Sequence, residues 1–181
     1  HNAAVKCGGE KFPLTDTSNG VIYIVRDPRD VIISYSSHYR IEPREAFDRM
    51  HSQHNHIWAT DSLERFEFLS RWDTHVLSWN SLSVPKLFLR YEDMLETPER
   101  SIKKIFEFLD LEPVISTEKI VNLTNFANLS KQEAVNGFNE AVNGATFFNQ
   151  GKSQQWKDLD LALLNEVTEA FGEAMGVFGY E

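Results

Sequence analysis

The sequence predicts an α/β protein built around a parallel β-sheet. Two short runs, Val21–Val25 and Lys86–Arg90, have continuous rather than alternating apolar residues, at 21–25 and at 87–89, which is typical of strands covered on both faces. The first is entered from a turn-like stretch at residues 16–20 and the second from Pro85. Helical segments lie between and after the two runs, an order that favours parallel strands joined by right-handed crossovers. Two or three strands are few for such a sheet.

Each predicted helix has a start signal or an apolar stripe. Asp30 is the candidate N-cap of a helix over residues 31–39, and Thr97 followed by Pro98 opens another. Apolar residues at spacings of three and four predict a helix over residues 63–79, and we expect further helices over residues 116–123 and 159–175.

Composition and charge exclude several classes of protein. The 181 residues are 41% apolar and 25% charged, so the chain is neither disordered nor fibrous, and we read it as one domain. No apolar run approaches the roughly 20 residues that span a bilayer. The lone Cys7 forms no internal disulfide, which suits a cytoplasmic protein. A net charge of −9 argues against a binder of nucleic acid or anionic membranes, so an anionic ligand requires a local basic cluster.

Residues 26–31 form the first motif with chemical content. They follow the first strand and open a helix, at the carboxyl end of a parallel strand where ligands bind in open α/β sheets. Arg26 supplies a guanidinium, and Ser34 a hydroxyl one helical turn beyond Asp30. This combination suits a phosphate group, although a capped turn with solvated ion pairs explains the same residues.

Residues 21–34 resemble the 3′-phosphate-binding segment of sulfotransferases that use 3′-phosphoadenosine 5′-phosphosulfate (PAPS). The resemblance implies that Arg26 and Ser34 hold the 3′-phosphate. Further motifs follow in the order that the family has them. Tyr91 occupies the place of a tyrosine beside the nucleotide, and Thr124 and Phe126 match a Thr-x-Phe element that contacts adenine.

Residues 147–157 resemble the family's loop that closes on the 3′-phosphate. The resemblance implies a cofactor-binding role for Asn149, Gln150, Gly151 and Lys152. Asn149 and Gln150 stand where the family has Arg and Lys, so the loop carries less positive charge than expected, and Lys152 is the residue that would compensate.

Two further differences from the family pattern lie nearby. Gln154 stands where the family has a second glycine. The segment with Lys157, Leu161, Ala162 and Glu166 has the spacing of the family's Lys-Thr-Val-Glu dimer element, but its two middle residues differ. A homodimer is therefore left open.

His1 begins a segment that resembles the one carrying the family's catalytic base. A neutral imidazole near pH 7 suits removal of a proton from an acceptor hydroxyl. An arbitrary terminal residue is the alternative reading, and the downstream motifs favour the base.

The resemblance also implies a P-loop NTPase-like parallel sheet flanked by helices. The family's phosphosulfate loop, of the type Pro-Lys-Ser-Gly-Thr-Thr, does not occur in these 181 residues. We therefore expect residues 1–181 to form a single sulfotransferase domain segment, about the carboxyl-terminal two-thirds of a family domain, without its first strand or strands. We expect this segment to bind the 3′-phosphate and adenine without competent chemistry, because the loop supplies a large electrostatic contribution.

The predicted function is transfer of a sulfuryl group from PAPS to a hydroxyl or amine, which leaves adenosine 3′,5′-bisphosphate (PAP). The expected partner is a small-molecule or glycan acceptor, and no metal, nucleic acid or membrane is required. One alternative is a non-catalytic nucleotide-binding module or decayed paralogue, which the residues Asn149 and Gln150 make credible. The other is a P-loop nucleotide kinase, which would need a Walker-type loop and Mg²⁺.

Overall fold

The computed structural model describes residues 1–7, 9–11, 15–58, 66–137 and 152–181, and all structural statements concern these ranges. The strands are β1 (Lys6–Cys7), β2 (Glu10–Lys11), β3 (Val21–Val25), β4 (His56–Trp58), β5 (Phe66–Phe68) and β6 (Lys86–Arg90). The helices are α1 (Pro28–Tyr39), α2 (Pro43–His51), α3 (Trp72–Asn80), α4 (Tyr91–Glu96), α5 (Pro98–Leu109), α6 (Thr117–Thr124), α7 (Phe126–Asn136) and α8 (Leu161–Val177). Short 3₁₀ turns are η1 (Thr15–Thr17) and η3 (Gln155–Asp158).

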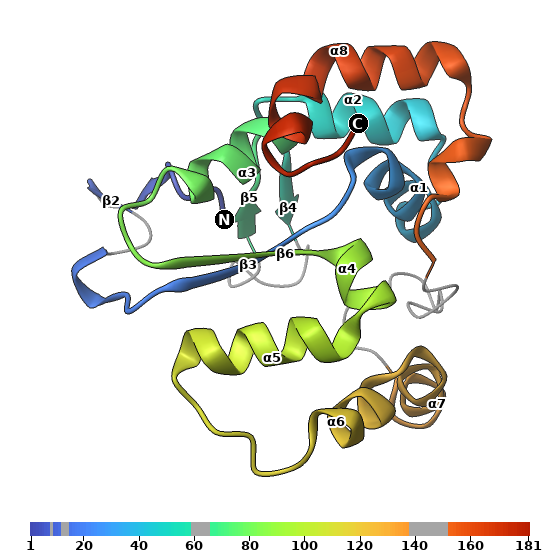
Figure 1. Ribbon diagram of the computed structural model, residues 1–181. Helices are drawn as coiled ribbons and strands as arrows, with labels where there is room; N and C mark the ends of the chain where they lie inside the picture. The colour runs from blue at the N-terminus through green and yellow to red at the C-terminus, as the bar shows by residue number, and fades with distance from the viewer. Residues whose placement is uncertain (8, 12–14, 59–65, 138–151) are drawn as a thin grey trace.

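The predicted parallel strand pair is confirmed, but the expectation that both faces are covered is wrong for β3, where Ile22 is 37% and Ile24 52% exposed. β3 pairs with β6 in a register that sets Val21 opposite Lys86 and Val25 opposite Arg90. Helices α1, α2, α3 and α8 lie on one side of this pair and α5 on the other (Figure 1). Because the two strands run in the same direction, the segments that follow them emerge at one edge, which brings the starts of α1 and α4 together. Within the described ranges the other strands form two small antiparallel sheets, β1–β2 and β4–β5.

Helix α1 begins three residues earlier than the sequence predicts. The N-cap is Asp27, whose carboxylate accepts the backbone N–H of Arg29, and Pro28 occupies the first helical position. The assignment of Asp30 as N-cap is therefore wrong: Asp30 lies inside the first turn and is fully buried. Proline explains the shift, since its fixed φ and missing N–H suit the first position of a helix.

The predicted helix over residues 63–79 is wrong in its first part. Phe66–Phe68 forms β5 and pairs antiparallel with β4, and α3 begins only after Ser70. Ser70 has a φ of 63°, and its backbone N–H donates to the carbonyl of Asn55 (2.9 Å). A left-handed residue held in this way keeps α3 from extending backward. The sequence spacing was compatible with a helix, but pairing with a distant strand decided the structure.

The remaining helix predictions are confirmed in place. The predictions over residues 116–123 and 159–175 correspond to α6 and α8, and Thr97 precedes α5 as its N-cap. Helix α7 was not predicted. It begins because the side chain of Asn125 accepts the backbone N–H of Asn128 (2.9 Å) and so caps the new helix directly after α6.

The hydrophobic core lies between α1, α2, α3 and α8. Phe171 of α8 is 1% exposed, and its ring centroid lies 5.9 Å from that of Phe47 and 5.5 Å from that of Trp72. Helices α6 and α7 contribute no buried residue. Within the described parts of the chain, no helix is both long and apolar enough to cross a bilayer.

Helix α5 approaches the sheet very closely at Gly20, the residue before β3. A Cβ atom at this position would lie 2.9 Å from Cζ of Phe108 and 3.2 Å from the carbonyl oxygen of Pro85. Glycine allows this approach because it has no side chain. Helix α5 in turn packs against α6, and α6 against α7.

Candidate functional site

Three of the predicted site residues meet where β3 ends. The guanidinium of Arg26 lies over the ring of Tyr91, with Cζ 4.6 Å from the ring centroid, and its Nη2 donates to the carbonyl oxygen of Lys152 (3.3 Å). The parallel register explains the meeting of Arg26 and Tyr91, since each directly follows one of the paired strands. Lys152 takes part through its backbone, and its side chain is exposed.

Arg26 keeps an unused hydrogen-bond donor in this position. Its Nε atom is buried and has no hydrogen-bond partner within the described part of the chain, while the side chain as a whole is 20% exposed. Buried donors in folded proteins are normally paired. A guanidinium with a spare N–H at the edge of a parallel sheet is therefore suited to an anionic group.

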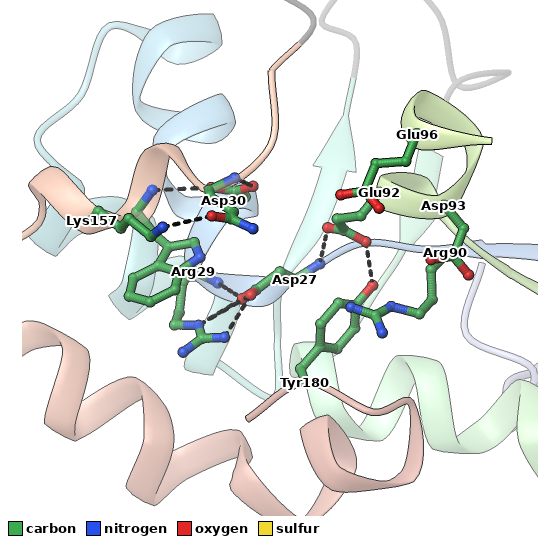
Figure 2. A pocket seen from close by; sticks show the side chains of 11 residues that line it. Asp27, Arg29, Asp30, Arg90, Glu92, Asp93, Glu96, Lys157 and Tyr180 are labelled. Carbon is green, nitrogen blue, oxygen red and sulfur yellow. Dashed lines mark hydrogen bonds and ion pairs between the residues drawn. The ribbon is translucent and has the colours of Figure 1, made fainter. Parts of the chain in front are cut away.

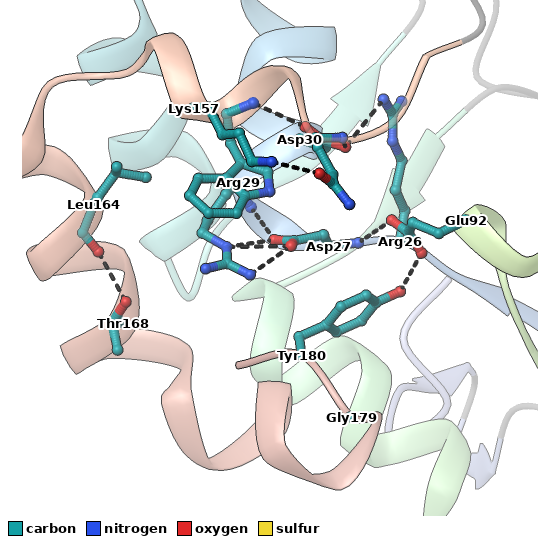
Figure 3. Close-up of polar contacts among 12 residues, drawn as sticks. Arg26, Asp27, Arg29, Asp30, Glu92, Lys157, Leu164, Thr168, Gly179 and Tyr180 are labelled. Carbon is teal, nitrogen blue, oxygen red and sulfur yellow. Dashed lines mark hydrogen bonds and ion pairs between the residues drawn. The ribbon is translucent and has the colours of Figure 1, made fainter.

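The buried carboxylate of Asp30 ties α1 to the segment that follows Gly151. Its Oδ2 accepts the backbone N–H of Gln154 (2.8 Å) and its Oδ1 that of Trp156 (3.0 Å) (Figure 3). Oδ2 also lies 3.9 Å from Nη2 of Arg26. Sequence reasoning missed this role, because both partners lie more than a hundred residues away along the chain.

A second buried carboxylate, that of Glu92, links β3 to the C-terminal residues. Its Oε1 accepts the backbone N–H of Asp27 (3.0 Å) and its Oε2 the hydroxyl of Tyr180 (2.8 Å). The Tyr180 hydroxyl also lies 3.2 Å from the carbonyl oxygen of Val25. Burial, with the neighbouring Glu92 carboxylate, raises the pKa of Tyr180 well above its ordinary value, so the hydroxyl stays a donor.

Arg29 holds the same region together on its other side. Its guanidinium forms a bidentate pair with Asp27 (2.7 Å from Nη2 to Oδ2) and lies 4.1 Å from the ring centroid of Trp156. Both charged side chains are largely buried. Because its donors face Asp27, Arg29 stabilises the start of α1 beside Arg26 rather than serving as a free anion ligand.

A pocket of about 390 Å³ adjoins these residues (Figure 2). Its lining contains three basic side chains and five carboxylates, those of Asp27, Asp30, Glu92, Asp93 and Glu96. Neither Arg26 nor Lys152 lines it. An excess of carboxylates makes this pocket unsuited to a phosphate, so the predicted anion site and the pocket are neighbours with different chemistry.

His1 lies against β5 and α3. Its Nδ1 accepts the backbone N–H of Phe68 (3.1 Å), and its carbonyl oxygen accepts the indole N–H of Trp79 (3.1 Å). Since Nδ1 is the acceptor, the neutral imidazole carries its proton on Nε2. His1 thus contacts β5 and α3, whereas Arg26 contacts Tyr91 and Lys152, so the two predicted site residues have different neighbours.

The other predicted residues have separate positions. Ser34 lies within α1, and its side chain is exposed. Thr124 ends α6 and donates its hydroxyl to the carbonyl of Ile120 (2.9 Å), while the half-buried Phe126 begins α7. Helix α6 packs against α5 and α7. The predicted residues Asn149, Gln150 and Gly151 lie outside the described residues.

A half-buried tyrosine–histidine pair joins β3 to α3. The hydroxyl of Tyr23 and Nδ1 of His75 are 2.7 Å apart. Burial, with the nearby positive charge of the chain's amino terminus, lowers the pKa of His75 to about 4, so this imidazole is neutral at pH 7. The described part of the chain gathers no group of three His, Cys, Asp or Glu side chains that could hold a metal ion.

Comparison with known proteins decides the family. The sequence model described as "Sulfotransferase domain" matches residues 12–179. The chain belongs to the sulfotransferase family. Similar sulfotransferases include sulfotransferase 1A1 of Bos taurus, which is 34% identical over 170 residues, covering 87% of this chain and 55% of the relative. Cytosolic sulfotransferase 8 of Arabidopsis thaliana is 30% identical over 167 residues, covering 81% of this chain and 46% of the relative.

Solved structures share the sulfotransferase fold of this chain. Mouse sulfotransferase SULT7A1 in complex with PAP superimposes with a TM-score of 0.65 at 24% identity, covering 85% of this chain and 58% of that one. Retinol dehydratase in complex with retinol and PAP gives a TM-score of 0.64 at 21% identity, covering 85% and 47%. These similarities confirm a parallel sheet flanked by helices, of the P-loop type. The chain spans about half the length of the curated relatives it matches.

Proposed function

We propose that this chain provides the 3′-phosphate and adenine half-site of a sulfotransferase that moves a sulfuryl group from PAPS to an acceptor hydroxyl or amine. The observation that carries the proposal is Arg26, whose buried Nε has no hydrogen-bond partner in the described ranges and which lies beside Tyr91 and Lys152. Family membership and the fold shared with PAP-bound sulfotransferases support it. On this proposal, residues 1–181 form a single sulfotransferase domain segment.

The residues divide into two groups on this proposal. Arg26 and Ser34, with residues 149–152, would hold the 3′-phosphate, and Arg26 would supply charge-assisted hydrogen bonds. Tyr91 would lie beside the nucleotide, and Thr124 and Phe126 would bind adenine through a hydroxyl and an aromatic face. PAPS, when bound, supplies the sulfuryl group and the driving force of its anhydride bond.

His1 would be the base that takes the acceptor's proton. In the observed arrangement Nδ1 accepts from Phe68, so Nε2 carries the proton of the neutral ring. His1 would therefore act as a base only once the bond to Phe68 is released and one ring nitrogen becomes free to accept. The role of His1 thus requires a local rearrangement beside β5.

The proposed acceptor is a small molecule or a glycan. Among structures of similar fold, retinol dehydratase has been crystallised with retinol and with androsterone. We propose the cytoplasm as the location, since one similar protein is named a cytosolic sulfotransferase. A homodimer through the segment around Glu166 would have to compete with an ion pair inside the chain, because Arg44 holds Glu166 at 2.8 Å.

Calorimetry with PAP tests the proposed function directly. The 181-residue chain should bind PAP without Mg²⁺, and Arg26→Ala should weaken binding by about 10-fold to 100-fold, the worth of one or two hydrogen bonds to a charged group. Arg100→Ala, which removes an exposed arginine of α5, is the control of equal charge. Equal affinity of wild type and Arg26→Ala would contradict the site. Binding of ATP that depends on Mg²⁺, without binding of PAP, would favour a nucleotide kinase.

A further inference from the structure

Asp30 is a fully buried carboxylate, and both of its oxygens accept hydrogen bonds from one distant segment of the described chain. Its two oxygens accept the backbone N–H groups of Gln154 (2.8 Å) and Trp156 (3.0 Å). A charged group without water needs such partners, since an unpaired buried carboxylate is strongly destabilising. The segment and the first turn of α1 therefore hold each other in place (Figure 3).

Two further contacts hold the same segment at alternate residues. The carbonyl oxygen of Lys152 accepts from Arg26, and the ring of Trp156 lies under the guanidinium of Arg29. Between them Gln154 has a φ of 60°, a left-handed conformation that a residue other than glycine rarely adopts without outside support. The hydrogen bond from its N–H to Asp30 provides that support.

The carboxylate of Asp30 is not itself suited to contact a phosphate. The two charges have the same sign, and the Asp30 side chain is 1% exposed. Its separation from Nη2 of Arg26 is 3.9 Å, which is an ion pair without a hydrogen bond. Arg26 therefore donates no hydrogen bond to Asp30, and its Nε stays unpartnered within the described ranges, while Asp30 uses its oxygens on the backbone.

We propose that Asp30 is a positioning residue of the 3′-phosphate site: it fixes the backbone of residues 154–156, and with it the carbonyl of Lys152, against Arg26. This inference rests on the proposed function and names a residue on which that site depends. On this proposal Asp30 acts through residues 154–156 and does not contact the nucleotide.

The test compares two nucleotides that differ only by the 3′-phosphate. Calorimetry gives the affinities of the 181-residue chain for PAP and for adenosine 5′-monophosphate, and the ratio of the two reports the 3′-phosphate site alone. Asp30→Asn should lower the ratio of the affinity for PAP to that for adenosine 5′-monophosphate about tenfold or more. An amide accepts through one oxygen only, and its NH₂ group would face a backbone N–H. A general loss of folding would weaken both nucleotides and leave the ratio unchanged.

Asp160→Asn is the matched control. Asp160, like Asp30, accepts a backbone N–H through its carboxylate, but its partner is Ala162 (2.6 Å) at the start of α8 and not a residue of the segment 152–156. Its ratio should equal that of the wild type. An unchanged ratio in Asp30→Asn, with the affinity for adenosine 5′-monophosphate retained, would overturn the positioning role while the proposed function stands. A wild-type ratio near one would overturn the proposed function and the inference with it.

Amide hydrogen exchange provides a measurement that does not depend on a variant. In the wild type, PAP should slow exchange at the N–H groups of Gln154 and Trp156, and adenosine 5′-monophosphate should not. The N–H of Val25 in β3 should be insensitive to the choice of nucleotide. Fast exchange at Gln154 and Trp156 with and without PAP would contradict the inference, even if Asp30→Asn failed to fold.

Discussion

The start of α1 and the pair α6–α7 both carry residues that the sequence assigns to the nucleotide, but they are built differently. At the start of α1, Asp30 and Glu92 are buried and bind backbone N–H groups of distant segments. Helices α6 and α7 contribute no buried side chain, and the hydroxyl of Thr124 is bonded within its own helix. The phosphate side of the proposed site is thus held by buried contacts between distant segments, whereas its adenine side lies on helices that bury no side chain.

The largest expected contrast is in packing. Phe171→Ala should lower the free energy of unfolding by about 3–5 kcal/mol, because it leaves a cavity among the rings of Phe47 and Trp72. Val135→Ala on α7, where the side chain is 82% exposed, should change it by less than about 0.5 kcal/mol. Urea unfolding of the two variants checks this. Equal losses would show that α7 belongs to the same cooperative core.

The pH dependence of stability should be governed in part by His75. Its pKa is about 4 in the folded chain and about 6.5 when unfolded, so only the unfolded state takes up a proton between those values. Stability is complete above about pH 6.5 and should fall as the pH is lowered toward 4, by on the order of 3 kcal/mol.

Unfolding curves between pH 7 and pH 4 test this expectation for His75. His75→Gln should reduce the slope, whereas the exposed His54→Gln should preserve it. The same slope in wild type and His75→Gln would assign the dependence to other groups.

The link between the C-terminal residues and β3 should have an intermediate effect. Tyr180→Phe removes the donor to Glu92 and should cost about 1–3 kcal/mol of stability, because a buried carboxylate loses a partner. Thr168→Val removes an exposed hydroxyl on α8 that is bonded to Leu164 and should cost less than about 0.5 kcal/mol. Thermal unfolding compares them. An unchanged unfolding temperature in Tyr180→Phe would mean that the hydroxyl does not stabilise the start of α1.

The smallest effect concerns the left-handed residue of the segment. Gln154→Gly should raise stability by about 0.5–1 kcal/mol, since glycine adopts a φ of 60° without strain and the lost contact to Lys157 is exposed. Gln155→Gly, within η3, should lower stability by a similar amount. Denaturant titration distinguishes the two. A lower stability of Gln154→Gly would show that the contacts of the glutamine side chain stabilise the fold by more than its left-handed backbone costs.

Local patterns sufficed for the two parallel strands and for most helices. Continuous apolar runs identified Val21–Val25 and Lys86–Arg90, and their parallel pairing is confirmed. The same local reasoning failed at Phe66–Phe68, where the spacing fits a helix but β4 supplies a pairing partner. Local periodicity contains no information about a partner strand elsewhere in the chain.

The candidate site was predictable where residues directly follow paired strands. Arg26 and Tyr91 do so, and the structure brings them together. The role of Asp30 was not predictable, because an aspartate before a helical stripe has the pattern of an N-cap. Only the position of Pro28, one residue after Asp27, indicates the earlier helix start that turns Asp30 inward.

The close approach at Gly20 has a mechanical consequence for the distant helices. Helix α5 packs on the sheet at that glycine, α6 packs against α5, and α7 packs against α6. A methyl group at residue 20 would push against Phe108 of α5, and a small rotation of α5 there would displace α6 and α7 by more than it displaces α5 itself. The packing that supports Thr124 and Phe126 thus begins at a residue that has no side chain and directly precedes β3.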